Sequence, residues 1–318
     1  MKQIREAIMP GAFAHLSVAN VAREFKAIKS LNMADNVKAQ LGSHLELIEL
    51  GSVSPDYPYL TLAFTDRAGQ TEWADYMHLG ETKLIVEALI RNTKGLNDED
   101  KLFVFPWLAG YVSHVIADVT IHPAVECRVG PYEGNEKAHR ICEMHQDTYI
   151  WFERTGLGEP GYCERISNNL TKHDVDGKFN PIIQNVWSAA LREVYPEKFE
   201  QSPPDIEGWH GGFQKITGTV EETYKLFEWA RHVAVNSGSG YPLREEVDVS
   251  YINNLTTPGK NKDYDEIFDL AVSNVRKYWE FLAVAVFDDG DTSMFKHWNL
   301  DNGIDAETGK QTMWENIS

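Results

Sequence analysis

The sequence has few cysteines and no long apolar run. The three cysteines are Cys127, Cys142 and Cys163, and no two of them form a CxxC pair. This odd, scattered set argues against a disulfide framework and against a thiolate zinc site. No stretch reaches the roughly 18 uninterrupted apolar residues of a transmembrane helix, and residues 1–16 lack the apolar core of a signal peptide. We therefore expect a cytoplasmic protein with no transmembrane segment.

Positive charge is also scarce. The chain has 30 Lys and Arg residues against 48 Asp and Glu residues, which gives a net charge of -18. Such an acidic protein repels polyanions, so we expect no stable complex with nucleic acid. A local cationic site could still bind a phosphate, and a metal ion would have to supply its charge. The sequence contains no P-loop, no GxGxxG after a strand and no GxSxG nucleophile motif.

Apolar residues recur at spacings of three and four through most of the chain, which is the pattern of amphipathic helices. Segments with this pattern cover residues 13–31, 73–92, 136–154, 181–195, 220–235 and 264–287. Strand patterns are scarce, and loops rich in Gly, Pro, Asn and Asp separate the segments. We predict an all-α fold with residues 1–318 as a single multi-helix domain. Its metal-site half covers about residues 10–155 and its helical C-terminal half about residues 160–318.

The stretch YVSHVIADVTIHP, residues 111–123, carries three titratable side chains inside an apolar run. His114, Asp118 and His122 recur every four residues, so a helix places them on one stripe. Asp118, with a histidine four residues away on either side, could bridge two metal ions about 3.5 to 4 Å apart. Pro123 is expected to end or kink this helix just after His122.

A second row of ligands follows one loop later. His139, Glu143 and Asp147 have the same four-residue spacing, whereas His145 lies off their stripe. Imidazole and carboxylate without thiolate is the ligand set of catalytic zinc. Each row alone also fits hydrogen-bonded core residues or pairs on a helix surface. The two rows together predict a hydrolytic metal cluster held between central helices.

Five segments resemble, in order, the zinc-dependent phospholipase C superfamily. They read PGAFAHL, GSVSPDYPYL, WADYMH, SHVIADVTIHP and AHRICEMHQD, and they span about residues 10–150. That superfamily includes single-strand-specific zinc nucleases and the catalytic part of glycosylphosphatidylinositol phospholipase D. The resemblance implies an all-helical fold with a cluster of up to three zinc ions that cleaves phosphate esters.

The resemblance also implies ligands for each ion. The first ion would take Asp56, His78, His114 and Asp118, the second would take His122, His139 and Glu143, and the third would take His15 and Asp118. In the family, the amine and carbonyl of the mature first residue complete the third site. Here fourteen residues precede His15, and a start at Met9 with removal of that residue would place Pro10 first.

The function expected on these grounds is a zinc-dependent phosphodiester hydrolase of the phospholipase C type. Two or three Zn²⁺ ions would activate water, and Asp56 would orient or deprotonate that water. The substrate would be a small phosphodiester or a phospholipid, and the sequence gives no oligomeric state.

Three alternatives stay open. A zinc nuclease of the same superfamily would need aromatic side chains for base stacking, for which Tyr57, Tyr59 and Trp73 are candidates. A non-catalytic helical scaffold would use metal for stability or for binding a partner. A metal-dependent phosphohydrolase of the HD type would use the adjacent pair His173 and Asp174.

Overall fold

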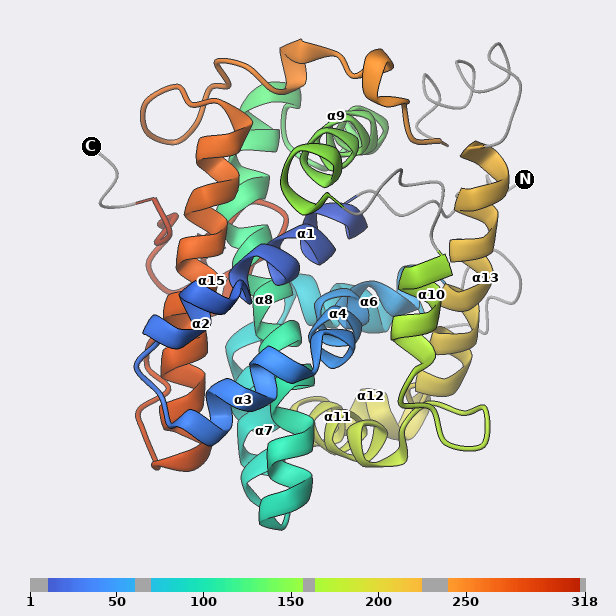
Figure 1. The fold of residues 1–318 in the computed structure, drawn as a ribbon, viewed down its shortest axis with the longest axis vertical. Coiled ribbons are helices and arrows are strands. Elements are labelled where there is room, and N and C mark those ends of the chain that lie inside the picture. The colour runs from blue at the N-terminus through green and yellow to red at the C-terminus, as the bar shows by residue number, and fades with distance from the viewer. Residues whose placement is uncertain (1–10, 61–69, 157–163, 225–239, 315–318) are drawn as a thin grey trace.

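The computed structural model describes residues 11–60, 70–156, 164–224 and 240–314 (Figure 1). The expected all-α fold is confirmed, because helices form most of the described chain. The helices are α1 (Ala12–Ala22), α2 (Phe25–Ser30), α3 (Asp35–Ser43), α4 (Leu45–Val53), α5 (Tyr57–Leu60), α6 (Glu72–Leu79), α7 (Thr82–Lys94), α8 (Asp98–Val129), α9 (Glu136–Ile150), α10 (Glu164–Thr171), α11 (Pro181–Val194), α12 (Pro196–Gln201), α13 (Ile206–Tyr224) and α15 (Tyr264–Phe287).

Short single-turn helices and one hairpin complete the described elements. They are η1 (Ser54–Asp56), η3 (Trp151–Thr155), η4 (Arg244–Glu246), η5 (Val249–Tyr251), β1 (Trp298–Asn299) and β2 (Ile304–Asp305). The expected helical segment 220–235 continues beyond Tyr224 into residues outside the described ranges, where Met9, Pro10 and Cys163 also lie. The division into one domain with two halves stays a prediction.

Helix α8 runs through the middle of the molecule (Figure 1). Its start follows from the sequence, because the Asn97 side chain accepts a hydrogen bond from the Asp100 N–H at 3.0 Å and acidic residues fill the first turn. Pro123 does not end the helix, which continues to Val129. Pro123 lacks the N–H that would bond to the carbonyl of Val119, and the chain near Gly303 packs closely against that carbonyl.

Two glycines allow α4 to cross α8 at short range. A Cβ on Gly51 would lie 2.0 Å from the carbonyl oxygen of Trp107, and one on Gly110 would lie 2.1 Å from the carbonyl oxygen of Ile48. Neither position tolerates a side chain, so the backbones themselves are in contact. This crossing places the end of α4 and the following η1 beside the ligand stripe of α8.

Helix α15 lies alongside α8 and closes the core from the C-terminal half (Figure 1). The indole N–H of Trp279 donates to the carbonyl of Ala109 at 2.9 Å and contacts the hydroxyl of Ser113 at 3.0 Å. Among the described residues, α8 alone is long and apolar enough to cross a membrane, and 89% of its most apolar window is buried inside the protein. Its apolar character matches its place in the core.

The hairpin formed by β1 and β2 lies against α6 and α7. Its two strands pair antiparallel, with Trp298 opposite Asp305 and Asn299 opposite Ile304. The hydroxyl of Thr82 donates to the carbonyl of Trp298 at 2.9 Å. The hairpin turn is thereby held next to the ligand-bearing helices.

Candidate metal centre

Polar contacts connect seven of the eight expected ligands. They come from α1 (His15), η1 (Asp56), α6 (His78), α8 (His114, Asp118 and His122) and α9 (Glu143). The eighth, His139, lies one turn before Glu143 on α9. The stripe on α8 therefore meets one member of the second row, Glu143. Helices α1, η1 and α6 add residues from distant segments.

Asp118 is the centre of the cluster. Its Oδ1 lies 3.1 Å from Nε2 of His15 and 3.5 Å from Nε2 of His122, whereas its Oδ2 lies 3.0 Å from Nε2 of His114. The side chain is 3% exposed. A carboxylate whose two oxygens face different imidazoles has the geometry of a bridging ligand.

His114 belongs to two groups of candidate ligands. One group is His15, His114 and Asp118, and the other is Asp56, His78 and His114, with the ligand atoms of each group within 4.8 Å of one another. In the second group, Oδ1 of Asp56 lies 3.2 Å from Nε2 of His78 and 3.9 Å from Nε2 of His114. The shared histidine places the two groups side by side.

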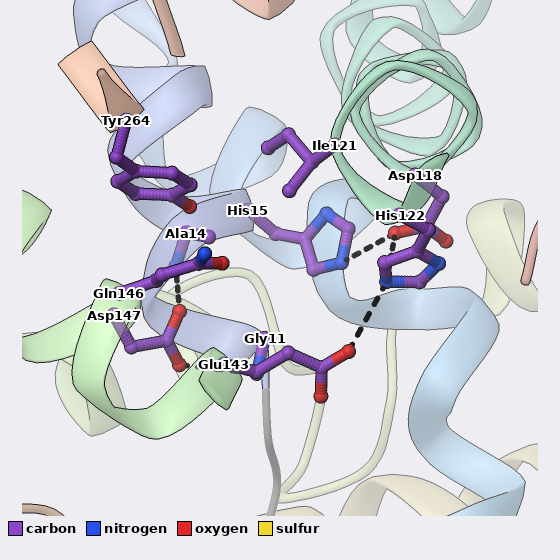
Figure 2. A pocket seen from close by; sticks show the side chains of 10 residues that line it. All are labelled: Gly11, Ala14, His15, Asp118, Ile121, His122, Glu143, Gln146, Asp147 and Tyr264. Atoms are coloured by element: carbon purple, nitrogen blue, oxygen red, sulfur yellow. Dashed lines mark hydrogen bonds and ion pairs between the residues drawn. The ribbon is translucent and has the colours of Figure 1, made fainter. Parts of the chain in front are cut away.

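His122 and Glu143 form a further pair beside Asp118 (Figure 2). Nε2 of His122 lies 3.5 Å from Oε1 of Glu143. His139 is oriented differently, because its Nε2 lies 2.7 Å from the carbonyl oxygen of Gly130. Nδ1 is therefore the nitrogen of His139 that could bind a metal.

Main-chain carbonyls fix three of the imidazole rings. In each ring Nδ1–H donates to a carbonyl: His78 to Ala74 at 2.8 Å, His114 to Ser52 at 2.9 Å and His122 to Leu300 at 2.7 Å. A carbonyl only accepts hydrogen bonds, so Nδ1 carries the hydrogen and the lone pair of the neutral ring lies on Nε2. This outer hydrogen bond is the usual support of a metal-binding histidine.

The donor set fits a metal ion. Nε2 of His78 and Nε2 of His114 face each other at 3.2 Å. If both rings were neutral with their lone pairs on Nε2, these lone pairs would repel each other, so either a proton or a metal ion must lie between them, and a carboxylate oxygen lies nearby. A divalent ion accepts all these lone pairs at once, and imidazole with carboxylate suits zinc.

Burial and neighbouring charges shift the pKa values of the ligands in opposite directions. Burial raises the pKa of Asp118, but the charges of His114, His122 and His15 outweigh it and hold that pKa well below its usual range. Burial lowers the pKa of His78, but the hydrogen bond and charge of Asp56 raise it to about 9.

Burial and neighbouring charges also oppose each other in the pKa values of His122 and Glu143. Burial lowers the pKa of His122, but Asp118, Glu143 and Asp301 raise it to about 9. Burial raises the pKa of Glu143 to about 8, although the charge of His122 opposes this shift. Protons therefore occupy several of these groups near neutral pH when the side chains have only one another as partners.

The hairpin contributes support that sequence reasoning missed. The N–H of Leu300 donates to the carbonyl of His78 at 2.9 Å, and the carbonyl of Leu300 accepts from His122. One residue thus braces two candidate ligands, and the next residue, Asp301, raises the pKa of His122 by its charge. Leu300 lies 178 residues from His122, so no local pattern could indicate this contact.

Asp147 caps helix α1. Its carboxylate accepts hydrogen bonds from the N–H groups of Gly11, Phe13 and Ala14 at 2.8 to 3.3 Å, and from the hydroxyl of Tyr241 at 3.1 Å. Burial raises the pKa of Asp147 to about 7, although these four donors oppose the shift. Asp147 thereby orients the turn of α1 that precedes His15 (Figure 2).

The remaining histidine candidates lie elsewhere. His145 packs its ring against Tyr251, and its Nδ1 accepts from the N–H of Asp248 at 3.0 Å. The neighbours His173 and Asp174 contact different groups, since Asp174 pairs with His210 at 3.1 Å. The geometry therefore does not place His173 and Asp174 on a common metal, as the HD-type alternative requires.

Comparison with known proteins identifies a family. The model of a family described as zinc dependent phospholipase C matches residues 14–196, which is more than half of the chain. No curated protein and no solved structure matches. The matched range contains all eight expected ligands and ends before the hairpin.

Proposed function

Because this chain belongs to the zinc-dependent phospholipase C family, we propose that it hydrolyses a small phosphodiester or a phospholipid with two or three zinc ions bound. The observation that carries the proposal is the position of Asp118 between His15, His114 and His122. A single carboxylate that bridges ions is the central element of hydrolytic multi-metal sites. The residues that would hold the ions are His15, Asp56, His78, His114, Asp118, His122, His139 and Glu143.

Asp56 is the proposed residue for orienting or deprotonating the attacking water. Its side chain is 17% exposed, compared with 3% for Asp118, so it lies at the solvent side of the cluster. Burial raises the pKa of Asp56, but the charges of His114 and His78 outweigh it and keep the carboxylate ionised. Oδ1 already contacts His78, which leaves Oδ2 to accept a hydrogen bond from water. Zinc, when bound, supplies Lewis acidity and neutralises the phosphoryl charge.

The surroundings favour a small substrate over a polynucleotide. Two of the aromatic residues considered for base stacking, Tyr57 and Trp73, are fully buried in the core. The third, Tyr59, donates its hydroxyl to Asp75 at 2.9 Å and lies beside the ring of His78. The net charge of -18 also repels a polyanion outside the metal cluster. The cytoplasmic location stays a prediction from the sequence.

The proposal is tested with zinc-loaded protein and three substrates at matched salt: a chromogenic phosphodiester, short-chain phosphatidylcholine and single-stranded DNA. We expect one of the first two to be cleaved fastest and chelation to abolish the activity. Faster cleavage of DNA would favour the nuclease. Full occupancy by zinc with no hydrolysis of any phosphodiester would favour the scaffold.

A further inference from the structure

A second group of metal-ligating side chains lies outside the proposed active site. His44 precedes α4, Glu46 is in the first turn of α4, and His173 lies just after α10. Nδ1 of His44 lies 3.3 Å from Oε1 of Glu46, and Nε2 of His173 lies 3.0 Å from the same oxygen. The three ligand atoms all lie within 4.8 Å of one another. Glu46 is buried, and the two histidines are partly exposed to solvent.

Without a metal ion, three hydrogen-bond donors crowd a single oxygen of Glu46. Oε1 of Glu46 faces His44, His173 and also the ammonium of Lys172, whose Nζ lies 2.9 Å away. A carboxylate oxygen offers two lone pairs, so at least two of the three donors must share one. A divalent ion needs no hydrogen on either imidazole, and its positive charge replaces the three donors.

We propose that His44, Glu46 and His173 form a second binding site for a divalent transition metal, with zinc as the expected ion. Two imidazoles and one carboxylate are a known zinc ligand set, which leaves a fourth position for water. Zinc ligand distances near 2.0 to 2.1 Å place tetrahedral ligand atoms about 3.3 Å apart. The imidazole nitrogens of His173 and His44 lie 3.0 and 3.3 Å from Oε1 of Glu46. The spacings around Asp118 in the active site fall in the same range.

Lys172 can leave the site when an ion binds. Its side chain is 56% exposed, whereas that of Glu46 is 7% exposed, so the ammonium can move into solvent when an ion replaces it beside Glu46. The ring of His173 is better held, because it packs edge-on against Phe103 at 5.4 Å and its main-chain carbonyl accepts from Asn180. Glu46 and His173 are therefore held in place by their surroundings, whereas the competing ammonium of Lys172 is free to move.

The second site would join two distant parts of the chain at the start of α4. Glu46 and His173 are 127 residues apart in sequence, so an ion shared by them would stabilise the fold by binding the native state. Asp56 follows Glu46 by ten residues, about 15 Å along a helical path. The second site is thus separate from the active site but anchors α4, whose C-terminal end carries Ser52 and leads into η1 with Asp56.

The test measures zinc content at equilibrium by elemental analysis for the full chain and for three variants. We expect the double variant His44→Ala with His173→Ala to bind one zinc ion fewer than the unmodified protein. Lys172→Ala should keep that ion and bind it about fivefold more tightly, because a competing positive charge is gone. His297→Ala is the matched control, since its partly exposed ring pairs with the carboxylate of Glu81 and, within the described part of the chain, with no second imidazole. This variant should lose no zinc.

Two outcomes would overturn the proposal. The double variant could retain as much zinc as the unmodified protein, or Lys172→Ala could leave zinc affinity unchanged and lower the stability, as expected of a simple ion-pair network. Should the double variant fail to fold, anomalous scattering at the zinc edge from crystals of the unmodified protein decides, and absence of a peak beside Glu46 counts against the site. These readouts do not depend on hydrolysis, so they are independent of the proposed function.

Discussion

Nε2 of His78 and Nε2 of His114 face each other at 3.2 Å, and both rings donate Nδ1–H to main-chain carbonyls. The carbonyls belong to Ala74, one turn earlier on the helix of His78, and to Ser52, near the end of α4. The backbone thereby holds both rings with Nε2 facing Nε2, so either a proton or a metal ion must lie between them. At pH 7 the raised pKa of His78 supplies that proton. A metal ion would displace it, so the fold orients both rings for metal before metal binds.

The first prediction concerns the bridging carboxylate. Asp118→Asn replaces one oxygen by an amide nitrogen that cannot bridge, so at least one zinc ion should be lost and hydrolysis should fall roughly 10³-fold or more. The helix should persist, because Asn costs only a few tenths of a kcal/mol in propensity. Zinc content, circular dichroism and kcat/KM provide the measurements.

His145→Ala is the control for that variant. His145 lies on α9, but its ring contacts Asp248 and Tyr251. Its removal should lower activity by less than about tenfold. Full zinc content and full rate in Asp118→Asn would show that Asp118 does not bridge.

The second prediction concerns pH. The pKa values of about 9 for His78 and His122 and about 8 for Glu143 mean that all three hold protons at pH 7. Zinc binds the deprotonated groups, so binding should release on the order of three protons at pH 7. Apparent affinity should rise with pH and level off above about pH 9.

Calorimetry in buffers of different ionisation enthalpy measures this release. Glu143→Gln should release about one proton fewer at pH 7, because that side chain no longer titrates. Zinc affinity that is the same at pH 6.5 and pH 8.5 would contradict the assignment of these groups as ligands.

The third prediction concerns the hairpin that braces His122. Gly303 has a φ of 70°, and a Cβ there would lie 2.6 Å from the carbonyl oxygen of Val119. Gly303→Ala should lower the melting temperature and weaken zinc binding, because the turn that carries Leu300 must move away from α8.

Gly309→Ala is the matched control for backbone strain. Gly309 has a φ of 69°, and a Cβ there would meet no atom within 4 Å. Gly309→Ala should therefore lower stability only by the cost of the left-handed conformation, about 1 kcal/mol. Equal effects of the two variants on zinc affinity would mean that the hairpin contact with α8 does not support the site.

The fourth prediction concerns the crossing of α4 and α8. Gly51→Ala places a methyl group 2.0 Å from the carbonyl of Trp107, so the helices must separate, and the cost should be several kcal/mol, on the order of 3 or more. Gly42→Ala meets no atom within 4 Å and lies in α3, so it should stabilise by about 0.5 to 1 kcal/mol. Urea denaturation compares the two, and a mild effect of Gly51→Ala would contradict the close crossing.

Residue spacing by itself determined the helical fold and the stripe on α8. A period near 3.6 residues and the four-residue repeat of His114, Asp118 and His122 are local properties, and a helix converts them directly into a shared face. Family resemblance was needed for His15, Asp56 and His78, because they come from separate elements with no common spacing.

Tertiary structure alone decided which groups support the ligands. Leu300 braces His122 across 178 residues, and Ser52 braces His114 across 62. Tertiary structure also decided that Asp147, which shares the stripe of Glu143, caps α1. It likewise decided that His173 faces Glu46, whereas the neighbouring Asp174 faces His210. Helix periodicity fixes which side chains share a face, but the partner of that face depends on how distant helices pack, and packing depends on contacts such as the glycine crossing of α4 with α8.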